Sequence, residues 1–167
     1  MLLEYDPGWL QEMVATHYRF LTEDEGFQVT ESTQYAVFLA RPGMRVRFTW
    51  DWRDNAFDLC FAGASPDAEM ITDSRLINYF ERPVFDYAAF MNRPEEPMGP
   101  MSDNLPGWSA KTQSYFSRIA AFFQPRGYPA RLQELKQWEA VESAALQRQI
   151  DDYEKAQEEK YRAGGDK

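Results

Sequence analysis

The chain has 167 residues, 44% of them hydrophobic and 16% aromatic, which predicts one core that buries about 70% of the unfolded surface and excludes a disordered acidic tail. Its net charge of −9 repels a phosphate backbone, so we expect no direct binding to nucleic acid. The single cysteine excludes an intramolecular disulfide and a cysteine metal site, and the single histidine excludes a multi-histidine site. The sequence has no secretion signal and no apolar run of about 18 residues, so we expect a cytoplasmic protein without a membrane span.

A first amphipathic helix is predicted from Asp6 to Gly26. Asp6 is a typical N-cap, and Gly26 can end the helix in the left-handed conformation. The apolar side of this helix comprises Trp9, Leu10, Met13, Val14, His17, Tyr18 and Leu21. The last turn is acidic, with Glu23, Asp24 and Glu25. Because the helix dipole disfavours negative charge there, we interpret these three residues as candidate contacts with a partner.

Four short strands are predicted next, since apolar residues alternate with period two from Phe27 to Phe61. Pro42 and Gly43 suit the centre of a type II turn. A tight turn there pairs Leu39 with Val46 on one face of the sheet. The pattern therefore predicts an antiparallel meander with helices against its apolar face.

The second hairpin of this meander carries the other candidate contacts. With its turn at Asp54 and Asn55, Trp50 pairs with Leu59 and Asp51 faces Asp58. Facing like charges destabilise a sheet by roughly 0.2–1 kcal/mol, so a cation should neutralise them. An arginine of the chain, a basic site on a partner, or a metal ion could supply it, although two carboxylates are few ligands for a metal. The candidate partner-binding residues here are Asp51, Trp52, Asp54 and Asp58.

Three helices are predicted in the second half: a short one from Asp73 that Pro83 ends, one over residues 109–123, and a long one after Pro129. The prolines and glycines of residues 94–107 predict a long loop or lid. The fold class is therefore α+β, with an N-terminal helix, a four-strand antiparallel meander and then three helices including a long C-terminal one. We expect a single domain over residues 1–150, and a charged helix end with a frayed tail over residues 151–167.

Catalytic motifs are absent from the sequence, which lacks a glycine-rich phosphate loop, a nucleophile elbow and paired metal ligands. His17 is interpreted as a histidine at the edge of the core, and Cys60 as a small strand residue covered by another element. We therefore predict no enzyme, no cofactor and no metal. The alternative is a small enzyme that uses paired carboxylates.

The first half of the chain resembles small bacterial immunity proteins of polymorphic-toxin and contact-inhibition systems. The likeness consists of a helix, Phe20-Leu21, Gly26-Phe27 and a three-strand meander, whose residues are Tyr35, Val37, Val46, Phe48, Asp51, Arg53, Phe57 and Leu59. The resemblance implies a non-catalytic cytoplasmic protein that binds one toxin domain and blocks its active site. Acidic members face toxins with basic surfaces. The family has no motif that assigns a role to a single residue here.

A secretion chaperone for an effector is a second possible binding function. Acidic α+β proteins of this size with a long terminal helix are similar to such chaperones, which usually dimerise around an apolar segment of the effector. The candidate apolar stripe consists of Met91, Met98 and Met101. Whether the chain is a monomer or a homodimer stays open.

Overall fold

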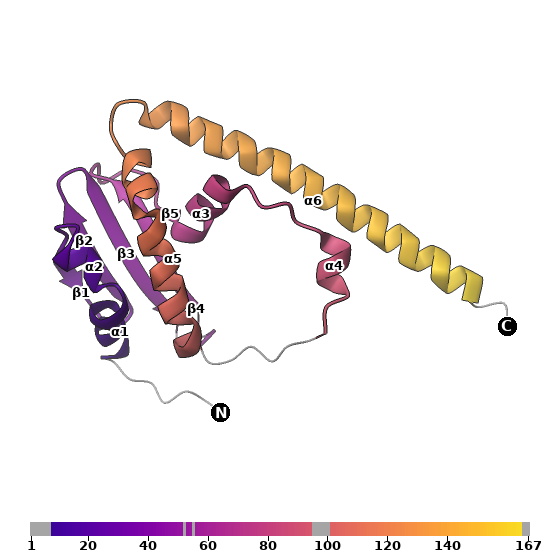
Figure 1. Cartoon of the computed structure of the whole chain (residues 1–167), viewed down its shortest axis with the longest axis horizontal. Coiled ribbons are helices and arrows are strands. Elements are labelled where there is room, and N and C mark those ends of the chain that lie inside the picture. Colours follow the sequence, from indigo (N-terminus) through magenta and orange to yellow (C-terminus); the bar gives the residue numbers. More distant parts are fainter. Residues whose placement is uncertain (1–7, 52, 55, 95–100, 165–167) are drawn as a thin grey trace. The chain divides into compact units, whose positions relative to one another are not determined.

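The computed structural model describes residues 8–51, 53–54, 56–94 and 101–164. It has an α+β fold, as predicted, in which an N-terminal helical segment precedes an antiparallel sheet and further helices follow it (Figure 1). The elements, in chain order, are α1 (Trp9–His17), α2 (Arg19–Glu23), β1 (Gln28–Ser32), β2 (Ala36–Arg41), β3 (Met44–Asp51), β4 (Ala56–Gly63), β5 (Ile71–Thr72), α3 (Asp73–Glu81), α4 (Tyr87–Met91), α5 (Met101–Phe122) and α6 (Tyr128–Gly164).

The chain divides into two compact units by its internal contacts. The first unit comprises residues 1–80 and 99–128, and the second comprises residues 81–98 and 129–167. That residues 1–150 form one domain stays a prediction. Among the helices of the described residues, none is both long enough and apolar enough to cross a membrane.

The sheet of the first unit has five antiparallel strands in the order β1-β2-β3-β4-β5. The first predicted hairpin is confirmed, because Leu39 pairs with Val46 and Gly43 has a φ of +86° in the two-residue turn. β3 alternates between buried and partly exposed residues along its length, as the period-two pattern predicts. All five residues of the edge strand β1 are exposed, and its pairing with β2 is interrupted by a bulge between Val29 and Glu31.

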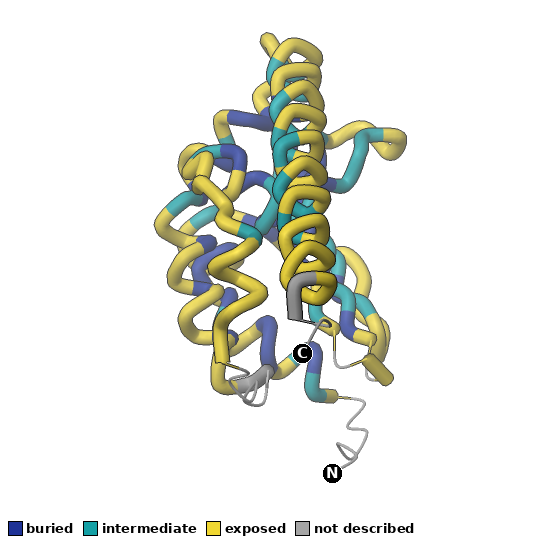
Figure 2. Tube along the Cα trace, turned by 90° about the vertical axis from the view of Figure 1, so that its right-hand side faces the viewer, coloured by how far each residue is buried: buried dark blue, intermediate teal, exposed yellow. Residues whose placement is uncertain are grey.

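An aromatic core joins α1, α2 and α5 to one face of this sheet. The Tyr18 ring lies 4.9 Å from the Phe48 ring of β3, and Phe116 of α5 lies 5.9 Å from Phe20 and 6.1 Å from Phe61. Four of these five aromatic side chains are 2% exposed or less, and Phe20 is 4% exposed. Figure 2 shows the buried residues gathered in the elements of this unit, and mostly exposed residues along α6.

The first predicted helix is divided in two. α1 ends at His17, because Tyr18 leaves the helical conformation with φ −112° and ψ 21°, and α2 follows from Arg19. The turn directs the Tyr18 side chain into the core, where it is 1% exposed. Gly26 adopts the expected left-handed conformation, with φ +71°. The predicted N-cap, Asp6, lies outside the described residues.

The predicted loop over residues 94–107 is wrong for its second part, because α5 begins at Met101 and contains Pro106. Pro106 is the sixth residue of α5 and lacks the N–H that would donate one intrahelical hydrogen bond, a cost that packing can outweigh. Leu105, before the proline, is 2% exposed, and the buried Ser109 donates its hydroxyl to the main-chain carbonyl of His17. These contacts hold the first turns of α5 against α1.

The second unit is held together by contacts between α6 and the segment before α4. The Gln149 side chain accepts a hydrogen bond from the Tyr87 amide at 2.8 Å and donates one to the Phe85 carbonyl at 2.9 Å. The Tyr87 ring packs edge-on against Tyr153 at 5.6 Å. α4 was not predicted, and its five residues are too few for a helical periodicity to be recognised.

Candidate functional site

The β3–β4 hairpin carries three of the predicted partner-binding carboxylates, but its register differs from the prediction. Asp51 pairs with Ala56, and Asp58 pairs with Thr49, so the predicted pairing of Asp51 with Asp58 is wrong. The connection spans residues 52–55 and is two residues longer than the expected turn, which moves every partner by two positions. Trp50 consequently pairs with Phe57 and not with Leu59. Trp52 and Asn55 lie outside the described residues.

Asp51, Asp54 and Asp58 are all exposed on this hairpin. Asp51 and Asp58 are diagonal neighbours across the two strands, which places them roughly 7–8 Å apart. At that separation two unit charges in water repel each other by only about 0.5 kcal/mol, so no cation between them is required. Oδ1 of Asp51 accepts a hydrogen bond from the Arg53 amide at 2.9 Å. None of the three carboxylates forms an ion pair with a described side chain.

The acidic end of α2 is partly neutralised within the chain. Glu23 lies 4.0 Å from Arg19 on the exposed surface of the helix, and Asp24 is exposed. Oε2 of Glu25 lies 3.0 Å from Nη1 of Arg41, at the end of β2. The side chains of Arg41 and Glu25 are 21% and 35% exposed, so this pair is more sheltered than the Arg19–Glu23 pair.

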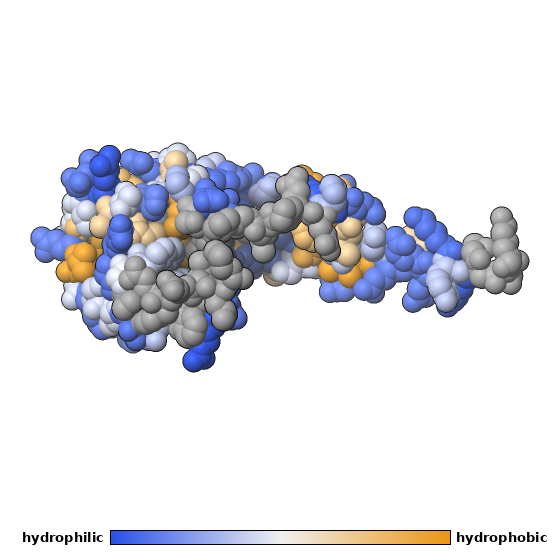
Figure 3. Space-filling view, turned by 90° about the horizontal axis from the view of Figure 1, so that it is seen from below, coloured by the Kyte–Doolittle hydropathy of each residue, from blue (hydrophilic) through white to orange (hydrophobic). Residues whose placement is uncertain are grey.

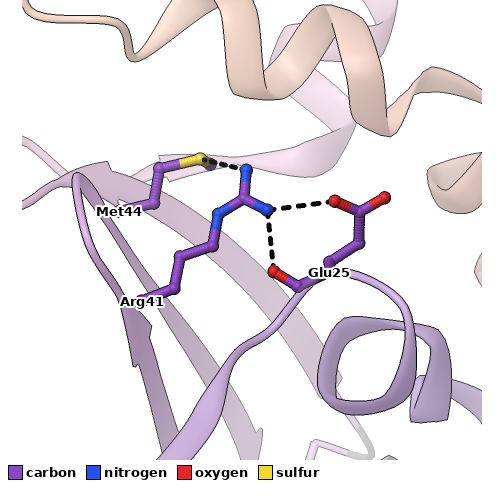
Figure 4. Close-up of polar contacts among 3 residues, drawn as sticks. All are labelled: Glu25, Arg41 and Met44. Carbon is purple, nitrogen blue, oxygen red and sulfur yellow. Dashed lines mark hydrogen bonds and ion pairs between the residues drawn. The ribbon is translucent and has the colours of Figure 1, made fainter.

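Arg41 binds the end of α2 through several contacts at once (Figure 4). The same Nη1 atom donates to the main-chain carbonyl of Glu25 at 2.8 Å, and Nη2 lies 3.5 Å from Sδ of Met44. The guanidinium also lies over the rings of Phe27 and Phe116, 4.9 and 5.1 Å from their centroids. Glu25 therefore serves the fold of the first unit, because its charge and its carbonyl both bind an arginine of the same chain.

The two acidic groups lie at opposite ends of β3. The Arg41–Glu25 contact is at the β2–β3 turn next to Met44, whereas Asp51 is the last residue of the strand. The strand has eight residues and spans about 23 Å at roughly 3.3 Å per residue. The predicted partner-binding residues are therefore not one cluster, and the exposed carboxylates of the hairpin are the part that is accessible without breaking an ion pair.

His17 and Cys60 occupy the structural positions predicted for them. His17 is partly buried at the end of α1, and Cys60 is 4% exposed. Sγ of Cys60 lies 3.8 Å from Nη2 of Arg47 on the paired strand. Burial raises the pKa of the Cys60 thiol, which keeps it protonated and weakly nucleophilic near neutral pH.

A groove in the second unit was not predicted. It has a volume of about 620 Å³ and lies between α6 and the segment that leads into α4. Its lining includes Val84 and Phe85, which are 97% and 44% exposed, and the neighbouring Phe90 and Met91 are 52% and 46% exposed. Figure 3 shows apolar side chains gathered over this part of the second unit. Met98 lies outside the described residues.

No group of three or more histidine, cysteine, aspartate or glutamate side chains within the described part of the chain is arranged to hold a metal ion. Comparisons of the chain with protein-family models, with curated proteins and with solved structures give no match.

Proposed function

We propose that the chain is a non-catalytic binding protein that acts in the cytoplasm and neutralises a cognate bacterial toxin by covering its active site. The observation that carries this proposal is the β3–β4 hairpin, where Asp51, Asp54 and Asp58 are exposed and form no ion pair with a described side chain. The resemblance of the first half of the chain to immunity proteins supports the same function.

Exposed carboxylates on one hairpin suit a partner with a basic surface. Opposite charge accelerates encounter between two proteins at low ionic strength, and the effect is screened over about 10 Å at 0.1 M salt. The acidic residues at the end of α2 contribute less to this proposal, because Glu23 and Glu25 already have arginine partners.

Co-expression with the toxic C-terminal domain of the protein encoded immediately upstream tests the function. We expect this chain to restore growth and to form a 1:1 complex with that domain. A chain that leaves the toxic domain fully active, or an upstream gene that encodes no such domain, would contradict the proposal.

The surface assignment is tested with the triple variant Asp51→Asn, Asp54→Asn and Asp58→Asn. We expect its association rate with the toxic domain to fall by about tenfold at low salt, and to depend less on salt than the wild-type rate. A matched control neutralises three exposed acidic residues elsewhere: Asp67→Asn, Glu154→Gln and Glu159→Gln. Equal association rates for the folded triple variant and the control would show that the hairpin is not the contact.

The exposed apolar groove of the second unit favours one other function, that of a chaperone for an amphipathic segment of an effector. Val84, Phe85, Phe90 and Met91 present the apolar surface that such a segment needs. This function predicts a dimer, and light scattering coupled to size exclusion measures it. A monomer at micromolar concentration would count against the chaperone and leave the toxin-binding proposal in place.

A further inference from the structure

A buried carboxyl group stands at the start of α3. Asp73 is 8% exposed, and both of its side-chain oxygens accept hydrogen bonds. The Ser74 amide donates to Oδ1 at 2.7 Å, and the hydroxyl of Thr112 on α5 donates to Oδ2 at 2.9 Å. Thr112 is itself fully buried. This hydrogen bond therefore joins α3 to α5 inside the core of the first unit.

The titratable side chains that interact electrostatically with Asp73 do not compensate its charge. They are the phenol of Tyr18 between α1 and α2, and the side chains of Asp58 and Cys60 on β4. Arg75, two residues along α3, is paired with Glu69 at 3.7 Å. No lysine or arginine within the described part of the chain forms an ion pair with Asp73.

A carboxylate in such a place is costly to bury, and a neutral carboxyl group is less so. In the neutral form the protonated Oδ2 would donate to the hydroxyl of Thr112, which can act as donor or acceptor, while Oδ1 keeps the hydrogen bond from the Ser74 amide. Burial is the main cause that raises the pKa of Asp73 above its ordinary value of 3.8, and the charge of Asp58 acts in the same direction. The hydrogen bonds from Thr112 and Ser74 favour the charged form and oppose this shift only in part.

We infer that the contact between Asp73 of α3 and Thr112 of α5 depends on pH and is strongest when Asp73 is protonated; we call this contact the latch. The first unit takes up a proton at this carboxyl group when α3 docks, and loss of that proton weakens the docking. The device is built from the burial of Asp73, its bond to Thr112 and the lack of a paired cation among the described residues.

The direction of the pH effect follows from linkage. In the unfolded chain Asp73 loses its proton at its ordinary pKa of 3.8, whereas in the folded state its pKa is higher. In the pH window between these two pKa values, the folded state keeps the proton that the unfolded chain has lost. Stability from this group is therefore greatest below the window and falls as pH rises through it, by up to about tenfold in the folding constant per pH unit. Tyr18 and Cys60 stay neutral there, because burial raises both of their pKa values.

Asp73→Asn tests the latch, because it replaces the carboxyl group by a neutral group of the same shape. Urea unfolding measures the folding constants of the variant and of the wild type at each pH. We expect the ratio of the variant's constant to the wild-type constant to rise between pH 4 and 7, because only the wild type loses stability as Asp73 loses its proton. The matched control Asp67→Asn changes an exposed residue and should keep a constant ratio to wild type. A constant ratio for Asp73→Asn as well would overturn the inference.

Two measurements on the wild-type protein do not depend on the variant folding. Hydrogen exchange should show that the amides of Leu76 and Ile77 in α3 lose protection with rising pH, relative to the amides of β3, after correction for intrinsic rates. Carbon-13 NMR should show that the Asp73 carboxyl group titrates above 3.8. A titration at or below that value would show that no latch exists.

Discussion

Replacing Arg41 by methionine should destabilise the first unit more than is usual for a partly exposed residue. Methionine keeps the apolar stem and loses the guanidinium. The charged hydrogen bond to the Glu25 carbonyl, at 2.8 Å, contributes about 1.5 kcal/mol. The ion pair with a 35% exposed carboxylate adds roughly 0.5 kcal/mol, and the two aromatic rings add about 0.5–1 kcal/mol. We therefore expect the free energy of unfolding to fall by about 2.5–3 kcal/mol.

The assay is urea unfolding followed by tryptophan fluorescence and by circular dichroism, and the matched control is Arg19→Met. The Arg19–Glu23 pair is 4.0 Å apart with side chains 72% and 65% exposed, so the control should lose less than about 0.5 kcal/mol. Glu25→Gln should fall between the two, because the carbonyl bond and the ring contacts of Arg41 remain. Equal losses for Arg41→Met and Arg19→Met would refute the reasoning.

Three further predictions concern other parts of the chain. Gly43→Ala should lower the free energy of unfolding by about 1 kcal/mol, because φ is +86° in the β2–β3 turn; calorimetry measures this, and an unchanged melting temperature would contradict it. Gly107→Ala should raise the free energy of unfolding by up to about 1 kcal/mol, because alanine favours the helical conformation and no heavy atom lies within 4 Å of the added Cβ. A lower free energy of unfolding would contradict this prediction. Gln149→Ala should speed proteolysis within residues 83–92, because the Phe85 carbonyl and the Tyr87 amide lose their bonds to α6; an unchanged cleavage pattern would show that other contacts hold the segment.

The central hairpins were predictable because two independent signals agree there. The alternation along Met44–Asp51 fixes the buried face, and Gly43 fixes the turn that sets the first register. The second register was missed because a shift of two residues leaves every side chain on the same face. The alternation of apolar residues therefore cannot distinguish a four-residue connection over residues 52–55 from a two-residue turn at Asp54 and Asn55. Strand β5 was missed because its two residues are too few to show an alternation.

The site residues were harder to predict than the fold, because their partners lie far away in the sequence. The acidic end of α2 is unfavourable for an isolated helix, and the only nearby cation in the sequence is Arg19, four residues before Glu23. The partner of Glu25 is Arg41, sixteen residues away on β2, and a local pattern does not show it. The burial of Asp73 depends in the same way on Thr112, thirty-nine residues further along the chain.

The bulge in β1 bears on how this protein avoids aggregation. An edge strand with every residue exposed offers main-chain donors and acceptors to the strand of another molecule. The irregularity between Val29 and Glu31 twists and interrupts that edge, and the charge of Glu31 opposes close approach of an identical strand. The opposite edge, β5, has only two residues. The sheet thus ends on both sides in strands that are poor templates for the growth of an intermolecular sheet.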